Sequence, residues 1–242
     1  MMQQKVLDQI EAVLKDEPSV HAMWLEGSWS RKSNDEFSDI DLWLDVDDGS
    51  EKNAFRLVKK TIGEFGELDL ELDMHQEHPR LEHRIYHLKD TSPYHIYEVV
   101  TQAHSRKFVF TRSIHEITVL FDKDNTIHWQ DYDEAKVHQE LKSRAQYLRE
   151  FLSLGQMIID KQIKRGKYID SFGYYVRWCL QPFIELVRIK YCPGRADLWI
   201  KDLKSDLPPE VVKEVEPLFQ VSSLEDISKN VEKASRLVKS LD

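Results

Sequence analysis

The chain has 242 residues, with 34 lysines and arginines against 43 aspartates and glutamates, so its formal net charge is -9. This length allows two modest domains or one large one, each with a real core. The acidic balance argues against non-specific binding of duplex nucleic acid, which requires a basic surface.

Neither the N-terminus nor the rest of the sequence contains a long apolar run. We therefore expect no signal peptide and no membrane span. The two cysteines, Cys179 and Cys192, have no metal-binding spacing and are expected to be free thiols in a reducing cytoplasm. These features predict a cytoplasmic protein.

The first 30 residues are predicted to form a helix, a strand and a tight turn. Apolar residues recur at helical spacing over 4–16, which is typical of an amphipathic helix. A strand over 20–26 then leads into Gly27-Ser28. Glycine permits a tight turn whose backbone N–H groups, and the neighbouring hydroxyl, can approach a phosphate.

A second strand, over 39–46, carries two acids on one face. Because strand side chains alternate, Asp39 and Asp41 point the same way, and the intervening apolar side chains point into a core. These core positions are Ile40, Leu42, Leu44 and Val46. Two neighbouring carboxylates repel and raise each other's pKa, and a divalent cation with a preference for oxygen ligands, such as Mg²⁺, removes that cost.

The sequence up to about residue 130 continues with alternating strands and helices. A helix is predicted over 51–64, and strands over 85–88, 94–100 and 117–121. Strict alternation over 68–74 predicts a half-buried strand whose acids, Asp69, Glu71 and Asp73, face water. Five histidines lie between His75 and His95, but their spacing lacks a zinc motif, so we interpret them as loop and edge-strand residues.

The second half of the sequence has a different character. From residue 133 on, apolar residues repeat at steps of three and four, first in a long helix and then in an aromatic-rich helix over 168–191 with a kink at Pro182. Shorter helices are predicted at about 197–205, 209–219 and 223–240. The fold class is therefore α+β, with an N-terminal domain over 1–130 and a helical bundle over 131–242.

The Gly27-Ser28 turn, the ten-residue spacer and the Asp39-Ile40-Asp41-Leu42 strand together resemble the signature of the DNA polymerase β-like nucleotidyltransferase superfamily. The whole chain looks like the small bacterial aminoglycoside and lincosamide nucleotidyltransferases. The resemblance implies an N-terminal mixed-sheet domain followed by a helical bundle. It also implies a third acid on a neighbouring strand, where this chain has Glu98 instead of the usual aspartate.

The resemblance further implies Mg²⁺-dependent transfer of a nucleoside monophosphate, AMP from ATP or the equivalent from another nucleoside triphosphate, to a hydroxyl of a small molecule such as an antibiotic. Asp39, Asp41 and Glu98 would be the catalytic residues and hold two Mg²⁺ ions, with Glu98 as either third ligand or base. Gly27, Ser28 and Arg31 would bind the nucleotide. No duplex nucleic acid or membrane is expected as a partner, and a homodimer is compatible with the sequence.

Two alternatives stay open from the sequence. One is a protein-adenylylating enzyme like the antitoxin members of the superfamily, although the additional helical bundle argues mildly against it. The other is a nucleotide-binding protein with weak catalysis. The intact Asp39/Asp41 pair argues against this reading, whereas glutamate at position 98 keeps it open.

Overall fold

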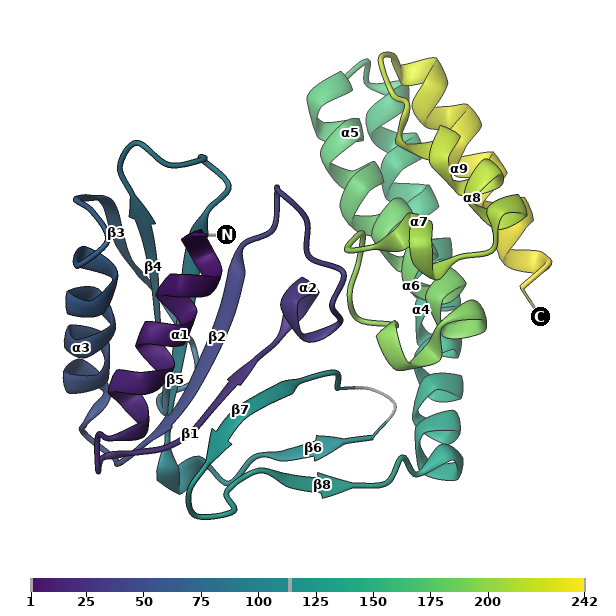
Figure 1. Cartoon of the computed structure of the whole chain (residues 1–242). Helices are drawn as coiled ribbons and strands as arrows, with labels where there is room; N and C mark the ends of the chain where they lie inside the picture. Colours follow the sequence, from purple (N-terminus) through teal and green to yellow (C-terminus); the bar gives the residue numbers. More distant parts are fainter. Residues whose placement is uncertain (1, 113–114, 242) are drawn as a thin grey trace. The chain divides into compact units, whose positions relative to one another are not determined.

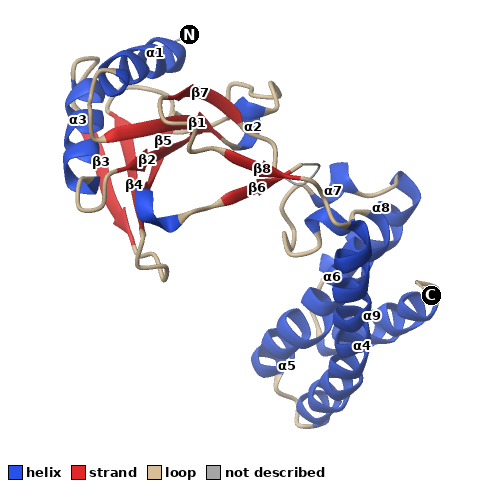
Figure 2. Cartoon of the chain, turned by 90° about the horizontal axis from the view of Figure 1, so that it is seen from below, coloured by secondary structure: helices blue, strands red, loops and turns tan. Residues whose placement is uncertain are grey.

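The computed structural model describes residues 2–112 and 115–241. They form two compact units, Met1–Tyr132 and Asp133–Asp242. The described part of the first unit contains a mixed sheet with helices, and that of the second contains only helices and their connections (Figures 1 and 2). The predicted α+β class is confirmed. No helix among the described residues is both long enough and apolar enough to cross a membrane.

The first unit is organised around a six-stranded sheet in the order β3-β4-β5-β2-β1-β7. Strands β2 and β5 run parallel, and every other neighbouring pair is antiparallel. The strands are β1 (Val20–Leu25), β2 (Ile40–Val46), β3 (Leu68–Met74), β4 (Leu81–Leu88), β5 (Ile96–Ala103) and β7 (Thr118–Asp122).

Two helices, α1 (Met2–Lys15) and α3 (Glu51–Gly63), pack on one face of this sheet (Figure 1). Their apolar residues share one core with alternate residues of β2, namely Ile40, Leu42, Leu44 and Val46, which are all buried as predicted. Burying this face leaves Asp41 and its alternate neighbours on the opposite face of the sheet.

Strand β3 corrects one prediction. The strand forms where expected, but it is not half-buried: Leu70, Leu72 and Met74 are 41%, 47% and 39% exposed. Across the ladder Leu72 lies opposite Ile85 and Glu71 opposite the buried Tyr86, so the apolar side chains lie on the face away from α3. Helix α3 instead meets the acidic side of the strand, where Lys59 Nζ lies 2.5 Å from Glu71 Oε2.

A small second sheet was not predicted. It pairs β6 (Val109–Thr111) with β8 (His128–Gln130) in parallel, and each strand has only three residues. Phe110 and Trp129 from this sheet pack with the buried Trp24 of β1. Three residues are too few to establish an alternating pattern, so side-chain packing rather than periodicity identifies these strands.

The second unit begins with the long helix α4 (Glu134–Lys164). Helices α5 (Tyr168–Tyr175) and α6 (Gln181–Tyr191) follow, joined by the π-helical turn η2 (Val176–Leu180). Pro182 is the second residue after this turn and has no N–H to donate, which disfavours regular α-helical bonding there. The remaining helices are η3 (Pro193–Arg195), α7 (Leu203–Asp206), α8 (Pro209–Val215), η4 (Glu216–Phe219) and α9 (Leu224–Lys239).

The helix predicted over 197–205 is wrong over most of its length. Trp199 and Asp202 adopt positive φ angles of 48° and 56°, which end any regular helix there. The fully buried Arg188 fixes this irregular segment, because its guanidinium donates to the carbonyl oxygen of Trp199 at 2.8 Å and to Asp206 Oδ2 at 2.6 Å. A buried arginine with such partners is not recognisable from periodicity.

Close approach of two helical segments in the second unit predicts a specific effect of Gly155→Ala. A Cβ at Gly155 would lie 2.4 Å from the carbonyl oxygen of Trp178. We expect the variant to lose about 1–3 kcal/mol of unfolding free energy, because backbone rather than a flexible side chain must shift. Urea unfolding measures this loss.

Gly173→Ala is the matched control, since Gly173 is also helical and a Cβ there meets nothing within 4 Å. It is expected to be neutral or to stabilise by up to about 1 kcal/mol, because alanine is the better helix former. Equal stability of the two variants would contradict the proposed helix contact.

Candidate active site

Three acids meet on the face of the sheet away from α1 and α3. In the parallel β2–β5 ladder Asp41 lies opposite Glu98, and Asp39 directly precedes β2. One carboxylate oxygen from each of Asp39, Asp41 and Glu98 lies within 4.8 Å of the other two, and all three residues are partly exposed. The three residues that the sequence suggests as metal ligands are therefore neighbours in space.

This geometry fits a divalent cation. Two unit negative charges at such a separation repel by roughly 3 kcal/mol at an effective dielectric constant of about 20. Oxygen-only ligands on a partly exposed site suit Mg²⁺, which binds through a few carboxylates and retains water or phosphate ligands. Asp39, Asp41 and Glu98 are the residues that could hold it.

The glycine turn lies directly against this acid group. Gly27 begins the four-residue helix α2 (Gly27–Ser30) with a φ of 63°, and a Cβ there would lie 1.8 Å from Asp41 Oδ2. The backbone N–H of Glu26 also donates to the carbonyl oxygen of Asp41 at 3.0 Å. Only glycine accommodates both the positive φ and this close approach.

Ser28 and Arg31 follow the turn and differ in their surroundings. Ser28 Oγ is buried and has no hydrogen-bond partner within the described residues, which is unusual for a hydroxyl. A phosphate oxygen would satisfy it. Arg31 Nε lies 4.0 Å from Glu116 Oε2, so its guanidinium is close to an acid.

The residues that hold the segment before Asp39 were not predicted from the sequence. The buried side chain of Gln3 on α1 donates to the carbonyl oxygen of Ser38 at 2.9 Å. Ser38 Oγ in turn donates to Asp35 Oδ1 at 2.9 Å. A polar residue at position 3 of an amphipathic helix gives no sequence signal, because its partner is 35 residues away.

His83 on β4 was also missed. It is 9% exposed and diagonally adjacent to Glu98, with Nε2 at 2.9 Å from Glu98 Oε1 and Nδ1 at 2.9 Å from Gln76 Nε2. Burial lowers the pKa of His83, and the charge of Asp41 opposes this shift. Among the five histidines between His75 and His95, both His83 and His87 lie diagonal to Glu98 in the β4–β5 ladder. Their side-chain contacts distinguish them, because His83 meets Glu98 and His87 meets Asp69.

A third aspartate on the same face of β2 has a different environment. Asp45 is 2% exposed and accepts from Gln102 Nε2 at 2.6 Å, while Nδ1 of His104 lies 2.6 Å from its other oxygen. These partners compensate for burying the carboxylate. Asp45 is therefore a structural acid.

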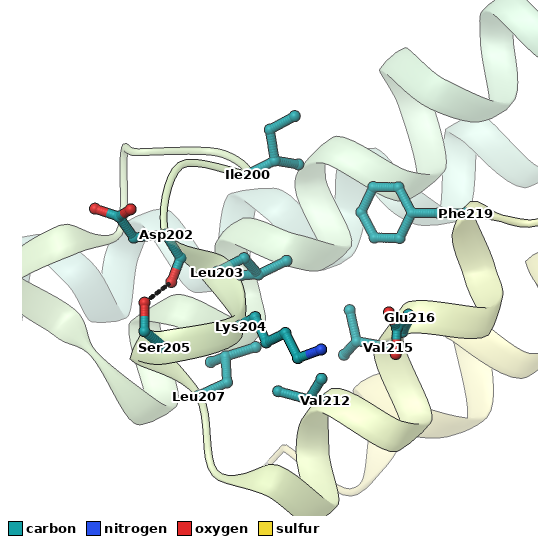
Figure 3. A pocket seen from close by; sticks show the side chains of 10 residues that line it. All are labelled: Ile200, Asp202, Leu203, Lys204, Ser205, Leu207, Val212, Val215, Glu216 and Phe219. Atoms are coloured by element: carbon teal, nitrogen blue, oxygen red, sulfur yellow. Dashed lines mark hydrogen bonds between the residues drawn. The ribbon is translucent and has the colours of Figure 1, made fainter. Parts of the chain in front are cut away.

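The second unit contains a cavity of about 460 Å³ (Figure 3). Apolar side chains such as Leu203, Leu207 and Val215 form much of its wall, and Lys204 extends its amine along it. None of the residues predicted for nucleotidyl transfer lines this cavity. The acid group in the first unit thus remains the candidate active site.

Residues 8–112 match the family model described as "Polymerase beta, Nucleotidyltransferase". This match spans the glycine turn, both strand aspartates and Glu98. The first unit therefore carries a nucleotidyltransferase domain of the polymerase β type. This domain supports nucleotidyl transfer as the chemistry of the protein.

Among solved structures, the chain is similar to an aminoglycoside 6-adenyltransferase from Bacillus subtilis, with 14% identity, a TM-score of 0.39, and coverage of 99% of this chain and 88% of that one. It is also similar to the spectinomycin adenyltransferase AAD(9) from Enterococcus faecialis, with 10% identity, a TM-score of 0.35, and coverage of 98% and 99%. A search of curated proteins found no match.

The contact between Gly27 and Asp41 predicts that Gly27→Ala is more harmful than an alanine at another positive-φ glycine. Gly49 has a φ of 88°, and a Cβ there meets nothing within 4 Å. We expect Gly49→Ala to lower the free energy of unfolding by about 1–2 kcal/mol, from backbone strain alone. Gly27→Ala should lower it by about 1–3 kcal/mol more than Gly49→Ala does, because the Asp41 carboxylate must also move.

Urea unfolding without added metal measures both effects. Equal losses in the two variants would show that the turn tolerates a side chain against Asp41.

Proposed function

We propose that this protein transfers a nucleoside monophosphate, AMP from ATP, to a hydroxyl group of a small-molecule acceptor in a Mg²⁺-dependent reaction. The proposal rests mainly on one observation. Carboxylate oxygens of Asp39, Asp41 and Glu98 lie within 4.8 Å of one another beside a glycine turn. A group of like charges at this distance is stable only with a compensating cation or donors.

In the proposed reaction, Asp39, Asp41 and Glu98 hold the metal, with two ions expected. The bound metal would neutralise charge on the triphosphate and on the departing pyrophosphate. Gly27 and Ser28 bind phosphate oxygens, supported by the close backbone approach at Gly27 and the unsatisfied hydroxyl of Ser28. Arg31 is proposed to neutralise phosphate charge, which requires its guanidinium to turn from Glu116.

Glu98 has a second proposed role beside metal binding. A carboxylate at the edge of the acid group can accept the proton of the acceptor hydroxyl as the new phosphoester bond forms. Glutamate has one more methylene than the aspartate that is usual in the superfamily, so its carboxylate reaches further toward an acceptor. The proton would then pass from the acceptor oxygen to Glu98 as pyrophosphate leaves.

The double variant Asp39→Asn/Asp41→Asn tests the site assignment. With Mg²⁺ and ATP near 100 times its dissociation constant, we expect the wild-type melting temperature to rise by about 5–10 °C. The double variant should show no such rise. Without metal it should be at least as stable as the wild type, because it removes two of three like charges.

Asp69→Asn/Asp73→Asn is the charge-matched control, since it removes two carboxylates from β3 outside the acid group. This control should retain the full Mg²⁺-dependent shift. A shift of wild-type size in the Asp39/Asp41 variant would remove these residues from the proposed site.

Pyrophosphate release tests the acceptor. With Mg²⁺ and ATP, we expect release to increase on adding one or more hydroxyl-bearing antibiotics from an aminoglycoside and lincosamide panel. Glu98→Gln should abolish the increase while the Mg²⁺-dependent thermal shift persists in weakened form. If only proteins become labelled with AMP, the acceptor is a polypeptide and the small-molecule proposal is wrong.

A further inference from the structure

The imidazole of His83 lies between an amide and the third acid of the site. Its Nδ1 lies 2.9 Å from the side-chain nitrogen of Gln76, and its Nε2 lies 2.9 Å from Glu98 Oε1. The side chain is 9% exposed. Both ring nitrogens are therefore directed at protein groups and not at bulk water.

The contact with Gln76 favours one tautomer. An amide nitrogen donates, so with that nitrogen facing the ring Nδ1 accepts and carries no proton. In a neutral imidazole the proton is then on Nε2, the nitrogen next to Glu98. An N–H facing a carboxylate is the favourable arrangement, and the opposite tautomer would set two lone pairs against each other.

The Nε2 contact is close but not aligned. Although 2.9 Å separates Nε2 from Glu98 Oε1, this buried nitrogen has no hydrogen bond of good geometry to any described residue. A buried unsatisfied donor is costly. Hydrogen bonds in active sites without ligand are often poorly aligned and tighten when the site is loaded.

We propose that His83, with its tautomer set by Gln76, is a positioning residue that fixes the Glu98 carboxylate for metal binding through an Nε2–H hydrogen bond. This inference rests on the proposed function of the acid group. By donating to one oxygen, the imidazole restricts rotation of the carboxylate, so the ligand oxygen stays near Asp39 and Asp41. Partners of this kind typically change metal affinity 10- to 100-fold.

The position of His83 in the sheet supports a role beyond filling space. Across the ladders, His83 lies opposite Val100, and Val100 lies opposite Trp43 on the same face as Asp41. An apolar side chain would fill this position without the desolvation cost of two ring nitrogens. The imidazole is thus the polar member of a row that otherwise consists of Met74, Val100, Trp43, Trp24 and Val119.

Mn²⁺ binding, followed by the electron paramagnetic resonance signal of the free ion, tests this inference without requiring turnover. His83→Leu keeps the volume and removes the donor, so its Mn²⁺ dissociation constant should rise at least tenfold. His83→Gln places an amide donor near the Nε2 position and should stay within about threefold of the wild type. Melting temperatures without metal should be similar for the two variants.

Gln76→Leu is a second variant that leaves His83 and the acids in place. Removing the Nδ1 partner should weaken Mn²⁺ binding by a few-fold, and side-chain ¹⁵N spectra should show a mixture of tautomers instead of the Nε2–H form. Wild-type spectra with the proton on Nδ1 would overturn the inference.

The binding series separates this inference from the proposed function. If Asp39→Asn/Asp41→Asn abolishes Mn²⁺ binding while His83→Leu binds like the wild type, His83 has no positioning role and the proposed function stands. If His83→Leu and His83→Gln lose Mn²⁺ affinity equally, the hydrogen bond to Glu98 does not determine metal affinity and the inference is wrong. If all variants bind like the wild type, both proposals fail.

Discussion

The first unit must hold Asp39, Asp41 and Glu98 together against their mutual repulsion. Their oxygens lie within 4.8 Å of one another because parallel pairing of β2 with β5 sets Asp41 opposite Glu98. Side chains alternate along a strand, so a slip of one residue would turn Glu98 into the buried face and Tyr97 out of it. The register is therefore fixed by apolar burial on one face, and that burial stabilises the unfavourable grouping of acids on the other.

The two faces of the sheet explain why the site lies where it does. Helices α1 and α3 cover one face, and their contacts also reach the site: Gln3 of α1 holds the carbonyl oxygen of Ser38, the residue before Asp39. At the end of β1, Gly27 allows the chain to turn against Asp41 without a Cβ. The local sequence thus determines the turn, whereas tertiary packing determines the distance between the acids.

Much of this arrangement could be predicted from the sequence, but only where a hydrophobic pattern is compatible with a single structure. Alternation in β2 correctly predicted both its core residues and the shared face of Asp39 and Asp41. The same alternation in β3 was misleading, because an edge strand can leave its apolar face uncovered. Periodicity does not reveal the three-residue strands β6 and β8 or the buried Arg188, since contacts made only in the folded protein determine them.

Asp41 and Asp45 show what determines whether an acid in this fold has a structural role or belongs to the candidate site. Both belong to β2 and lie on the same face, four residues apart, and no sequence pattern separates them. Asp45 is buried against Gln102 and His104, so its charge is compensated within the protein. Asp41 is instead partly exposed and grouped with two further acids. A carboxylate packed against donors is already stabilised, whereas a group of three carboxylates gains most from a cation, and contacts made only in the folded sheet decide which case applies.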